Sequence, residues 1–394
     1  MKHLGLVTSS YPRFPGDLAG AFVRRAALDL CRRGLRVTVV APRDGRASRP
    51  PLDASIEVVE VTVPDRVFYG PGAPERMASQ SLGWALRAPS AVLKLMESSE
   101  RALRDCDALV AHWLLPAGLA VRWAAAGRRY AVVEHSSAAR LLLGAGRCGA
   151  LGVQGLSSGA AFVAASEPRL AARLDAFCSQ GVHWLPPSTE LDAFLGLETP
   201  SLRGPLQLGF LGRRVPIKGL EVLLQAFAQV RGSMRLHLAG PGQRVRAAGV
   251  VDWGALHGVE ALRDFFSSID VLVIPSRSLG SRREGFPCVL LEAWAAGRPV
   301  LASALDVLDL PLLNPGSSWR FSPGDVWGLA QRLHALASHP EQVDGEALRC
   351  RRRALAVHRY REAVSSFMLE RLEVLGKRDG AAEKRDEHVL AVGA

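Results

Sequence analysis

The chain has 394 residues, of which 48% are hydrophobic and 22% charged, a balance typical of a globular protein and not of a disordered one. A chain of this length is longer than one ordinary hydrophobic core can organise, so we expect two domains. The net charge is +11, but the arginines are scattered and no nucleic-acid-binding motif accompanies them, so nucleic acid ranks behind an anionic membrane surface or phosphate-bearing small molecules as a partner.

The N-terminus runs directly into a strand pattern and lacks the apolar stretch and cleavage site of a signal peptide. No run of about 18 apolar residues is present that would form a membrane-spanning helix. We therefore expect a cytoplasmic protein, with peripheral contact at the inner face of the membrane left open. The six cysteines contain no Cys-x-x-Cys pair, which favours reduced, mostly buried thiols over a metal site or a disulfide framework.

Strand and helix patterns alternate in the N-terminal half. An apolar run at residues 3–9 predicts a buried parallel strand, and a loop at 11–20 separates it from a helix at 21–33, which Gly34 ends. A strand at 36–41 completes a β-loop-α-β unit of the Rossmann type. Further strands are predicted at 56–63, 108–111, 130–133, 161–165 and 183–185. Such alternation indicates a mostly parallel sheet covered by helices.

A second cycle follows a proline- and glycine-containing stretch at residues 190–205, which we interpret as a domain boundary. Its predicted elements are a strand at 206–211, a loop at 212–219, a helix at 220–230, strands at 235–239 and 271–274, a helix at 289–296 and a strand at 299–302. The predicted α/β organisation has an N-terminal Rossmann-like domain (1–198), a C-terminal one (199–350), a helical stretch that returns to the first domain (351–375) and a disordered tail (376–394).

The sharpest local pattern is SRREGFPCVLLEAWAAGRPVLAS. Glu284 follows a predicted strand, and Pro287 suits the first turn of the next helix, where its missing N–H costs nothing. Backbone N–H groups near Cys288 and Val289 would form an anion site at the positive end of that helix. Glu292 lies inside the helix among apolar residues, where its carboxylate needs a hydrogen-bond partner such as ribose hydroxyls. A glutamate on the solvent face of the helix is the alternative.

A second pattern, LGFLGRRVPIKG, ends a strand at Gly212 and begins a helix near Gly219. Glycine lets the backbone approach a ligand closely. Arg213 and Lys218 would bring two positive charges onto a diphosphate, which arginine binds bidentately. A basic surface loop is the alternative interpretation.

These patterns belong to a longer series. Gly-Arg-x4-Lys-Gly (212–219), Ala-Gly-Pro-Gly (239–242), Asp-Val-Leu-Val-Ile-Pro-Ser (270–276) and Glu-Gly-Phe-Pro-x4-Glu (within 284–300) occur in that order. The series resembles the retaining glycosyltransferases of family four, whose GT-B fold has two Rossmann-like domains facing each other across a cleft. Seven residues separate the two glutamates, as the family signature requires. The resemblance covers about residues 1–375.

The resemblance implies a nucleotide-sugar donor on the C-terminal domain. Arg213 and Lys218 would hold the diphosphate, Glu284 would contact the sugar and Glu292 the ribose. The implied donor-binding residues are Gly16, Gly20, Gly212, Arg213, Lys218, Gly285, Phe286, Cys288, Val289 and Glu292. The base would lie near residues 251–257, held mostly by backbone groups. The predicted C-terminal domain contains no Asp-x-Asp motif, so we expect neither a metal ion nor a cofactor beyond the donor substrate.

The N-terminal half resembles the family less tightly. Gly16 and Gly20 would bring backbone to phosphate or acceptor. His112, in DALVAHWLLPAG, would face the donor sugar, although a core histidine is the alternative. Glu134 and His135 follow at the next strand end and are the acceptor-side candidates. The catalytic set implied is His112, Arg213, Lys218 and Glu284.

Two departures from the family pattern stand out. The sequence Pro-Pro-Ser-Thr-Glu at 186–190 replaces the usual Pro-Asn-x-x-Asp, and residues 304–309 replace a glycine-rich loop that often lies beside the diphosphate. The second departure puts donor affinity in doubt, but not the fold.

The implied reaction is transfer of a hexose-type sugar, with retention, to a hydroxyl of a glycan, a glycolipid or a small natural product. A basic, apolar segment at residues 66–96 would suit an anionic membrane and a lipid-linked acceptor, while a pair of helices packed over the sheet is the favoured alternative. Two rival functions remain: a nucleotide-sugar 2-epimerase using Glu134 or His135, and a degenerate binder of nucleotide sugars, which only the altered loop at 304–309 supports.

Overall fold

The computed structural model describes residues 2–17, 19–43, 53–63, 67–69, 82–200, 204–230, 234–279, 284–308 and 319–374. The chain forms two compact units. Unit 1 comprises residues 1–188 and 360–394, and unit 2 comprises residues 189–359. The division thus falls earlier than the boundary predicted at 198/199, and the chain returns to unit 1 later than predicted. The predicted disordered tail at 376–394 lies outside the described residues.

Unit 1 contains a parallel sheet with the strand order β3-β2-β1-β4-β5-β6-β7. Its strands are β1 (His3–Thr8), β2 (Arg36–Arg43), β3 (Ile56–Thr62), β4 (Ala108–His112), β5 (Tyr130–Glu134), β6 (Phe162–Ala165) and β7 (His183–Trp184). Every strand predicted for this half is confirmed, with ends shifted by one or two residues at most. The apolar runs of β1, β4 and β5 are buried throughout or nearly so, as expected for strands covered on both faces.

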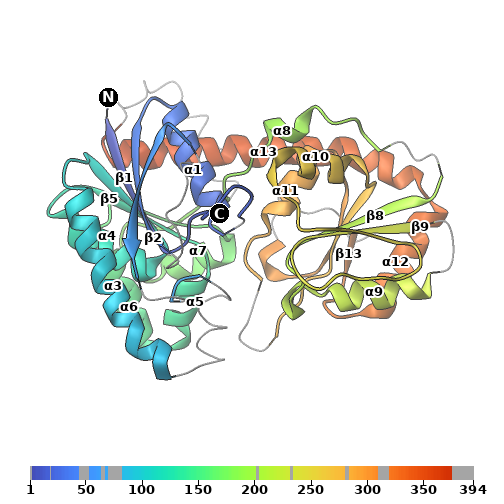
Figure 1. Cartoon of the computed structure of the whole chain (residues 1–394), viewed down its shortest axis with the longest axis horizontal. Coiled ribbons are helices and arrows are strands. Elements are labelled where there is room, and N and C mark those ends of the chain that lie inside the picture. Colours follow the sequence, from blue (N-terminus) through green and yellow to red (C-terminus); the bar gives the residue numbers. More distant parts are fainter. Residues whose placement is uncertain are drawn as a thin grey trace. The chain divides into compact units, whose positions relative to one another are not determined.

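Helices cover both faces of this sheet (Figure 1). They are α1 (Ala21–Arg32), α3 (Leu82–Ala102), α4 (Leu119–Ala125), α5 (Ser137–Gly144), α6 (Gly146–Ser157) and α7 (Pro168–Asp175), with a short π-helix η1 (Leu114–Gly118) after β4. Helices α3 and α4 pack side by side. The connection from β1 to β2 through α1 and the connection from β3 to β4 through α3 run in opposite directions along the sheet. Because such crossovers are right-handed, α1 lies on the opposite face of the sheet from α3 and α4.

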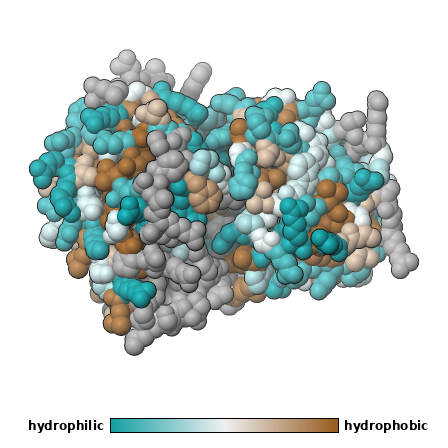
Figure 2. All heavy atoms as spheres, viewed as in Figure 1, coloured by the Kyte–Doolittle hydropathy of each residue, from teal (hydrophilic) through white to brown (hydrophobic). Residues whose placement is uncertain are grey.

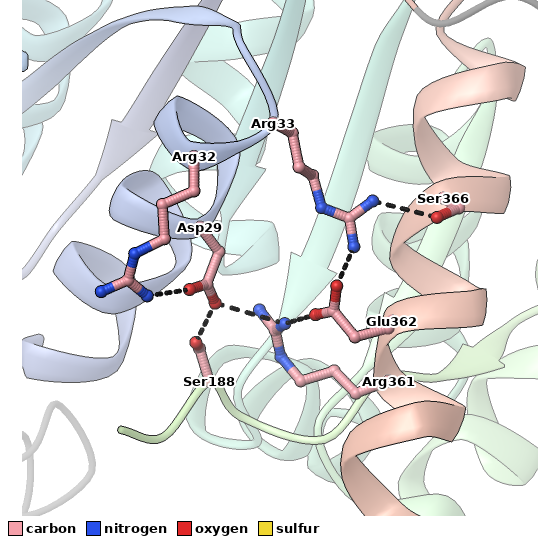
Figure 3. A network of polar contacts seen from close by, with 7 residues as sticks. All are labelled: Asp29, Arg32, Arg33, Ser188, Arg361, Glu362 and Ser366. Carbon is pink, nitrogen blue, oxygen red and sulfur yellow. Dashed lines mark hydrogen bonds and ion pairs between the residues drawn. The ribbon is translucent and has the colours of Figure 1, made fainter. Parts of the chain in front are cut away.

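The C-terminal part of the helix α13 (Glu341–Arg371), from Tyr360 on, belongs to unit 1 and packs against α1 and the residue that ends it. Figure 3 shows the polar network between them. Arg33 pairs with Glu362 and donates to Ser366, while Asp29 accepts a hydrogen bond from Ser188 and pairs with Arg361. Because Arg361 is buried, its guanidinium depends on these carboxylates for compensation.

Unit 2 contains a second parallel sheet with the order β10-β9-β8-β11-β12-β13. Its strands are β8 (Leu206–Leu211), β9 (Met234–Ala239), β10 (Val250–Gly254), β11 (Val271–Ile274), β12 (Val300–Ser303) and β13 (Arg320–Phe321). The strands β10 and β13 were not predicted. Both lie at an edge of the sheet, where a short strand needs little apolar sequence.

The helices of unit 2 are α8 (Asp192–Leu195), α9 (Leu220–Gln229), α10 (Gly258–Ser267), α11 (Cys288–Ala295), α12 (Val326–Ser338) and the first part of α13, with short 3₁₀-helices η2 (Pro216–Lys218) and η3 (Asp306–Leu308). Helices α9 and α12 cover one face of the sheet, and α10 and α11 the other (Figure 1). The core between β8, β9 and α9 includes Leu208, Phe210, Leu236 and Leu223.

Both sheets reverse their strand order at one place, between β1 and β4 in unit 1 and between β8 and β11 in unit 2. In open α/β sheets, ligands bind outside the carboxyl ends of the strands at such a reversal. The loops after β1 and β8, and the residues that end β4 and follow β11, are therefore the places where a site is expected. These are the segments that carry most of the predicted site residues.

The remaining expectations concern cysteines and membranes. All six cysteines are free thiols; Cys106, Cys178 and Cys350 are buried, whereas Cys148 is exposed. None of the helices in the described ranges is long and apolar enough to cross a membrane. The segment at 66–96 is described only in part, and its second half begins α3.

Candidate functional site

The loop after β8 is shaped by Gly219, whose φ of +65° lies in the left-handed region. A Cβ atom at this position would lie 1.9 Å from the carbonyl oxygen of Pro275, the residue that follows β11. Only glycine therefore lets η2 pass so close to the end of β11. Gly212, by contrast, has room for a Cβ atom, since the nearest side chain would lie 3.7 Å away from it.

Lys218 and Glu284 come from two separate sequence motifs, and the structure joins them. Nζ of Lys218 donates a hydrogen bond to Oε1 of Glu284 at 2.7 Å. Their side chains are only 19% and 11% exposed, so water screens the pair weakly. The sequence interpretation of Lys218 as part of a basic surface loop is therefore wrong, because its charge is held inside the unit by a carboxylate.

Glu292 lies on α11 and is 6% exposed, which excludes a position on the solvent face of the helix. Helix α11 begins at Cys288, one residue earlier than predicted, and Pro287 is its N-cap and not a residue of its first turn. The N-cap residue, Pro287, makes no side-chain hydrogen bond at this end of α11. The backbone N–H groups of its first turn form the positive end of the helix dipole, as an anion site requires.

Four further predicted donor residues surround that helix start. Phe286 is buried, and Gly285, Cys288 and Val289 are half-buried. Glu284 directly precedes them in the chain. The start of α11, Glu292 and the Lys218–Glu284 pair thus belong to one unit and to the strand ends at its sheet reversal. The donor contacts assigned to these residues stay predictions.

Arg213 and Arg214 are adjacent but differ in environment. Arg213 is exposed, whereas the side chain of Arg214 is 5% exposed and binds Asp252 of β10 through two hydrogen bonds of 2.6 Å. The hydrogen bonds from Arg214 hold the pKa of Asp252 well below its usual range. This pair fixes the loop after β8 to the strand whose end is expected to hold the base.

Sequence reasoning missed the Arg214–Asp252 pair, since β10 itself was not predicted. The altered loop at 304–309 is described as far as Leu308. There the chain forms η3, in which Val307 and Leu308 are buried. Among the described residues, no group of three or more histidine, cysteine or acidic side chains could hold a metal ion.

In unit 1, His112 ends β4 and His135 follows β5. Nδ1 of His112 lies 2.9 Å from Nε2 of His135, and the two rings are parallel within 7°. His112 is buried, and burial lowers its pKa to about 3, with the positive charge of Arg361 adding to the effect. Both the predicted catalytic histidine and one acceptor-side candidate thus belong to a single pair.

Glu134 precedes His135 and is fully buried. Its Oε2 accepts a hydrogen bond of 2.7 Å from the backbone N–H of Leu114 in η1. Burial raises the pKa of Glu134 to about 7, although backbone N–H groups that bind it act in the opposite direction. Its contact with an acceptor stays a prediction.

The loop after β1 contains Gly16 and Gly20, with φ values of +84° and +66°. A Cβ atom on Gly20 would lie 2.1 Å from the carbonyl oxygen of Ser10. Close packing of the chain on itself therefore accounts for this glycine. Contact of either glycine with a phosphate or an acceptor is still a prediction.

Two family models match the chain. Residues 19–184 match the model described as "Glycosyl transferase 4-like domain", and residues 205–339 match the one described as "Glycosyl transferases group 1". Together they cover most of both units. The family resemblance deduced from the sequence motifs is thus confirmed.

Curated relatives of three kinds are similar to the chain. D-inositol 3-phosphate glycosyltransferase of Streptomyces coelicolor is 32% identical over 34% of this chain and 33% of its own length. Glycogen synthase of Mycobacterium tuberculosis is 29% identical over 38% of each chain. The putative teichuronic acid biosynthesis glycosyltransferase TuaC of Bacillus subtilis is 26% identical over 75% of this chain and 79% of its own. The alignment thus spans about a third of the length of the first of these relatives.

Solved structures share the fold. Sucrose-phosphate synthase of Thermosynechococcus elongatus has a TM-score of 0.69 at 19% identity, covering 91% of this chain and 95% of its own. Anabaena HepE, solved in complex with UDP and glucose, has a TM-score of 0.68 at 16% identity, covering 94% of this chain and 100% of its own. The two-unit α/β architecture is therefore that of GT-B proteins.

Proposed function

This chain belongs to the group 1 glycosyltransferases of the GT-B fold, and from that premise we propose that it is a retaining glycosyltransferase. The donor is a nucleoside-diphosphate sugar with a hexose-type sugar, and the acceptor is a hydroxyl group. The observation that carries the proposal is the Lys218–Glu284 pair, at 2.7 Å, in the same unit as the start of α11 and the buried Glu292.

Each of these groups suits one part of such a donor. Lys218 and the exposed Arg213 supply positive charge for the diphosphate, together with the N–H groups at the start of α11. Glu284 accepts hydrogen bonds from sugar hydroxyls while it orients Lys218. Glu292 accepts hydrogen bonds from the ribose hydroxyls.

The same groups account for catalysis. As the bond between the anomeric carbon and the diphosphate breaks, negative charge grows on the leaving nucleotide, and fixed cations and helix N–H groups stabilise it. Two side-chain cations at this position make a reaction without a divalent cation feasible. His112 is proposed to contact the sugar.

The relatives support the donor class and leave the acceptor broad. The HepE complexes hold UDP and glucose, or UDP-glucose, which supports a nucleotide sugar here. The names of the curated relatives point to an inositol phosphate, glycogen and teichuronic acid. We therefore keep a glycan, a lipid-linked acceptor and a small molecule as the acceptor classes. The 2-epimerase alternative gains no support from these relatives.

We propose in addition that the protein is cytoplasmic and that α3 contacts the membrane surface peripherally. Leu86 and Leu93 are exposed there, two helical turns apart, beside the exposed Arg87 and Lys94. Figure 2 shows apolar patches separated by hydrophilic side chains on the visible face. Cosedimentation with vesicles of phosphatidylglycerol, but not of phosphatidylcholine, is expected. Binding to neither vesicle, or no loss of binding in the Leu86→Ser/Leu93→Ser variant, contradicts this contact.

The donor proposal is tested by thermal unfolding with a panel of nucleoside diphosphates and their sugar conjugates. A ligand that binds only the folded state stabilises it by about 2.7 kcal/mol when its concentration is a hundred times its dissociation constant. We expect one nucleotide series to raise the melting temperature of the wild type and of Arg235→Ala, which removes an exposed cation of the same unit. Lys218→Ala should lose the shift. No shift with any nucleotide would refute donor binding.

A further inference from the structure

Two histidines end neighbouring strands of unit 1 and bind each other. His112 is the last residue of β4, and His135 directly follows β5, which is hydrogen-bonded to β4 in parallel register. The atoms in contact are Nδ1 of His112 and Nε2 of His135, 2.9 Å apart. Such a bond requires that one ring donates and the other accepts, so the protonation of each ring depends on the other.

The backbone after each histidine is strained. Trp113 has φ = 80° and Ser136 has φ = 84°, in a region that residues other than glycine rarely adopt. Only four described residues that are not glycine have positive φ, and these two directly follow His112 and His135. Strain of this kind persists where the surrounding structure enforces it, and it concentrates at functional sites.

Aromatic rings hold His135 in place. The ring centroid of Phe22, on α1, lies 4.5 Å from that of His135, and the ring centroid of Trp113 lies 5.0 Å from that of His135. Phe22 and Trp113 also contact each other edge to face. Because Phe22 and Trp113 come from different segments of the chain and pack on His135 together, rotation of His135 away from His112 would open an apolar cluster.

Electrostatics keep the pair neutral. Burial lowers the pKa of His112 to about 3 and holds the pKa of His135 well below its usual value. Arg361 adds positive charge on the His112 side, and Figure 3 shows this buried guanidinium fixed by Asp29 and Glu362. An imidazolium is therefore disfavoured, and two neutral rings share the hydrogen bond.

The direction of that bond follows from imidazole chemistry. The neutral histidine ring intrinsically favours the tautomer with hydrogen on Nε2. If His135 donates from Nε2, both rings keep this favoured tautomer. If His112 donated from Nδ1 instead, both rings would have to adopt the disfavoured one.

We propose that His135 is a positioning residue for His112: its Nε2–H donates to Nδ1 of His112 and thereby presents Nε2–H of His112 as a fixed hydrogen-bond donor to an oxygen of the substrate sugar. His112 then acts as a neutral donor and not as a base. The part of this inference that concerns the sugar rests on the proposed function. The tautomer and its dependence on His135 do not.

The test is the tautomer of His112 in the ¹⁵N-histidine-labelled full chain, read from long-range ¹H–¹⁵N correlations and assigned with His112→Gln. In the wild type we expect one Nε2–H tautomer that does not titrate between about pH 5 and 8. In His135→Phe, which keeps a ring but removes the donor, His112 should show averaged tautomers. His183→Phe is the matched control, since His183 stacks on Phe162 elsewhere in unit 1. An Nδ1–H tautomer in the wild type overturns the proposal.

The kinetic arm compares His135→Phe with His135→Gln, whose amide can still donate. With the donor found by thermal unfolding, His135→Phe should lower kcat about five- to tenfold, the effect of one neutral hydrogen bond, with little change in KM for the nucleotide sugar. His135→Gln should recover most of this loss. If the wild type transfers no sugar, the proposed function fails, while the tautomer measurement still decides the role of His135. If His112 is unchanged in His135→Phe, the positioning role is refuted whatever the activity.

Discussion

Nζ of Lys218 lies 2.7 Å from Oε1 of Glu284, although 66 positions separate the two residues in the chain. Gly219 makes this contact feasible, because it lets the loop after β8 pass against Pro275 at the end of β11. Without a donor, the carboxylate thus neutralises the cation that we assign to the diphosphate. Lys218 is held in place before the ligand arrives, which lowers the entropy cost of binding.

Glu284→Gln separates the two roles of this carboxylate. The variant removes a negative charge beside the proposed diphosphate position, so the affinity for the nucleoside diphosphate should stay the same or rise. The transfer rate should fall about a hundredfold or more, because a sugar contact made in the transition state is lost. Calorimetry with the diphosphate and a transfer assay check the two halves. A variant that loses affinity but keeps kcat would contradict the assignment of Glu284 to the sugar.

The neighbouring arginines should respond in opposite ways. Arg214→Met leaves Asp252 buried without its partner and should destabilise the protein by about 3 kcal/mol. Arg213→Met removes an exposed cation and should change stability by less than about 0.5 kcal/mol while weakening donor binding. Urea unfolding of both variants, followed by nucleotide titration of Arg213→Met, measures these effects. Equal destabilisation by the two substitutions would show that the pair has no special structural role.

Gly219→Ala tests the close approach of the two strand ends. Alanine at positive φ costs about 1–2 kcal/mol by itself, and here its Cβ would also meet the Pro275 carbonyl oxygen. Gly324→Ala is the matched control, because Gly324 has φ = +81° with no atom near a Cβ. We expect Gly219→Ala to lose more stability than Gly324→Ala and to lose the nucleotide-induced shift in melting temperature. Similar melting temperatures and retained binding would rule out the close approach.

Glu134 should make stability depend on pH. Its folded-state pKa of about 7 lies above the ordinary value of 4.5, so between these values the folded protein binds more protons than the unfolded chain. The stability it contributes is complete below about pH 4.5 and is lost as the pH rises through 7. Glu134→Gln keeps an acceptor for the Leu114 N–H but cannot ionise, so its melting temperature relative to the wild type should rise from about pH 4.5 to about pH 8. The exposed Glu97→Gln is the control. Parallel curves for Glu134→Gln and the wild type would argue against a buried ionising carboxyl.

Much of the fold could be predicted from the sequence, because its buried parallel strands are short apolar runs with clear ends. The strands at β1, β4, β5, β8 and β11 are of this kind. The strand β10 was missed because it carries Asp252 and Trp253 at a sheet edge, and the partner of Asp252 is Arg214, 38 positions away in the chain. The edge strand β13 has only two residues, too few for a pattern.

The sequence names candidate site residues where a motif lies within one loop or helix turn, as for Lys218, Glu284 and Glu292, and their contacts with a donor stay predictions. Contacts between distant segments were not. The sequence named both His112 and His135, but only the register of β4 against β5 brings their rings together. The buried Arg361 lies in a charged helical stretch whose pattern does not distinguish a buried guanidinium from a solvated one.

Whether the protein transfers sugar is tested by the release of nucleoside diphosphate from the nucleotide sugar that stabilises it, measured with and without candidate acceptor alcohols. We expect release by the wild type and by Arg235→Ala, faster with an acceptor, and loss of release in Lys218→Ala. Stabilisation by the nucleotide sugar without any release by the wild type would contradict the proposed transfer and identify a binding protein that does not transfer sugar.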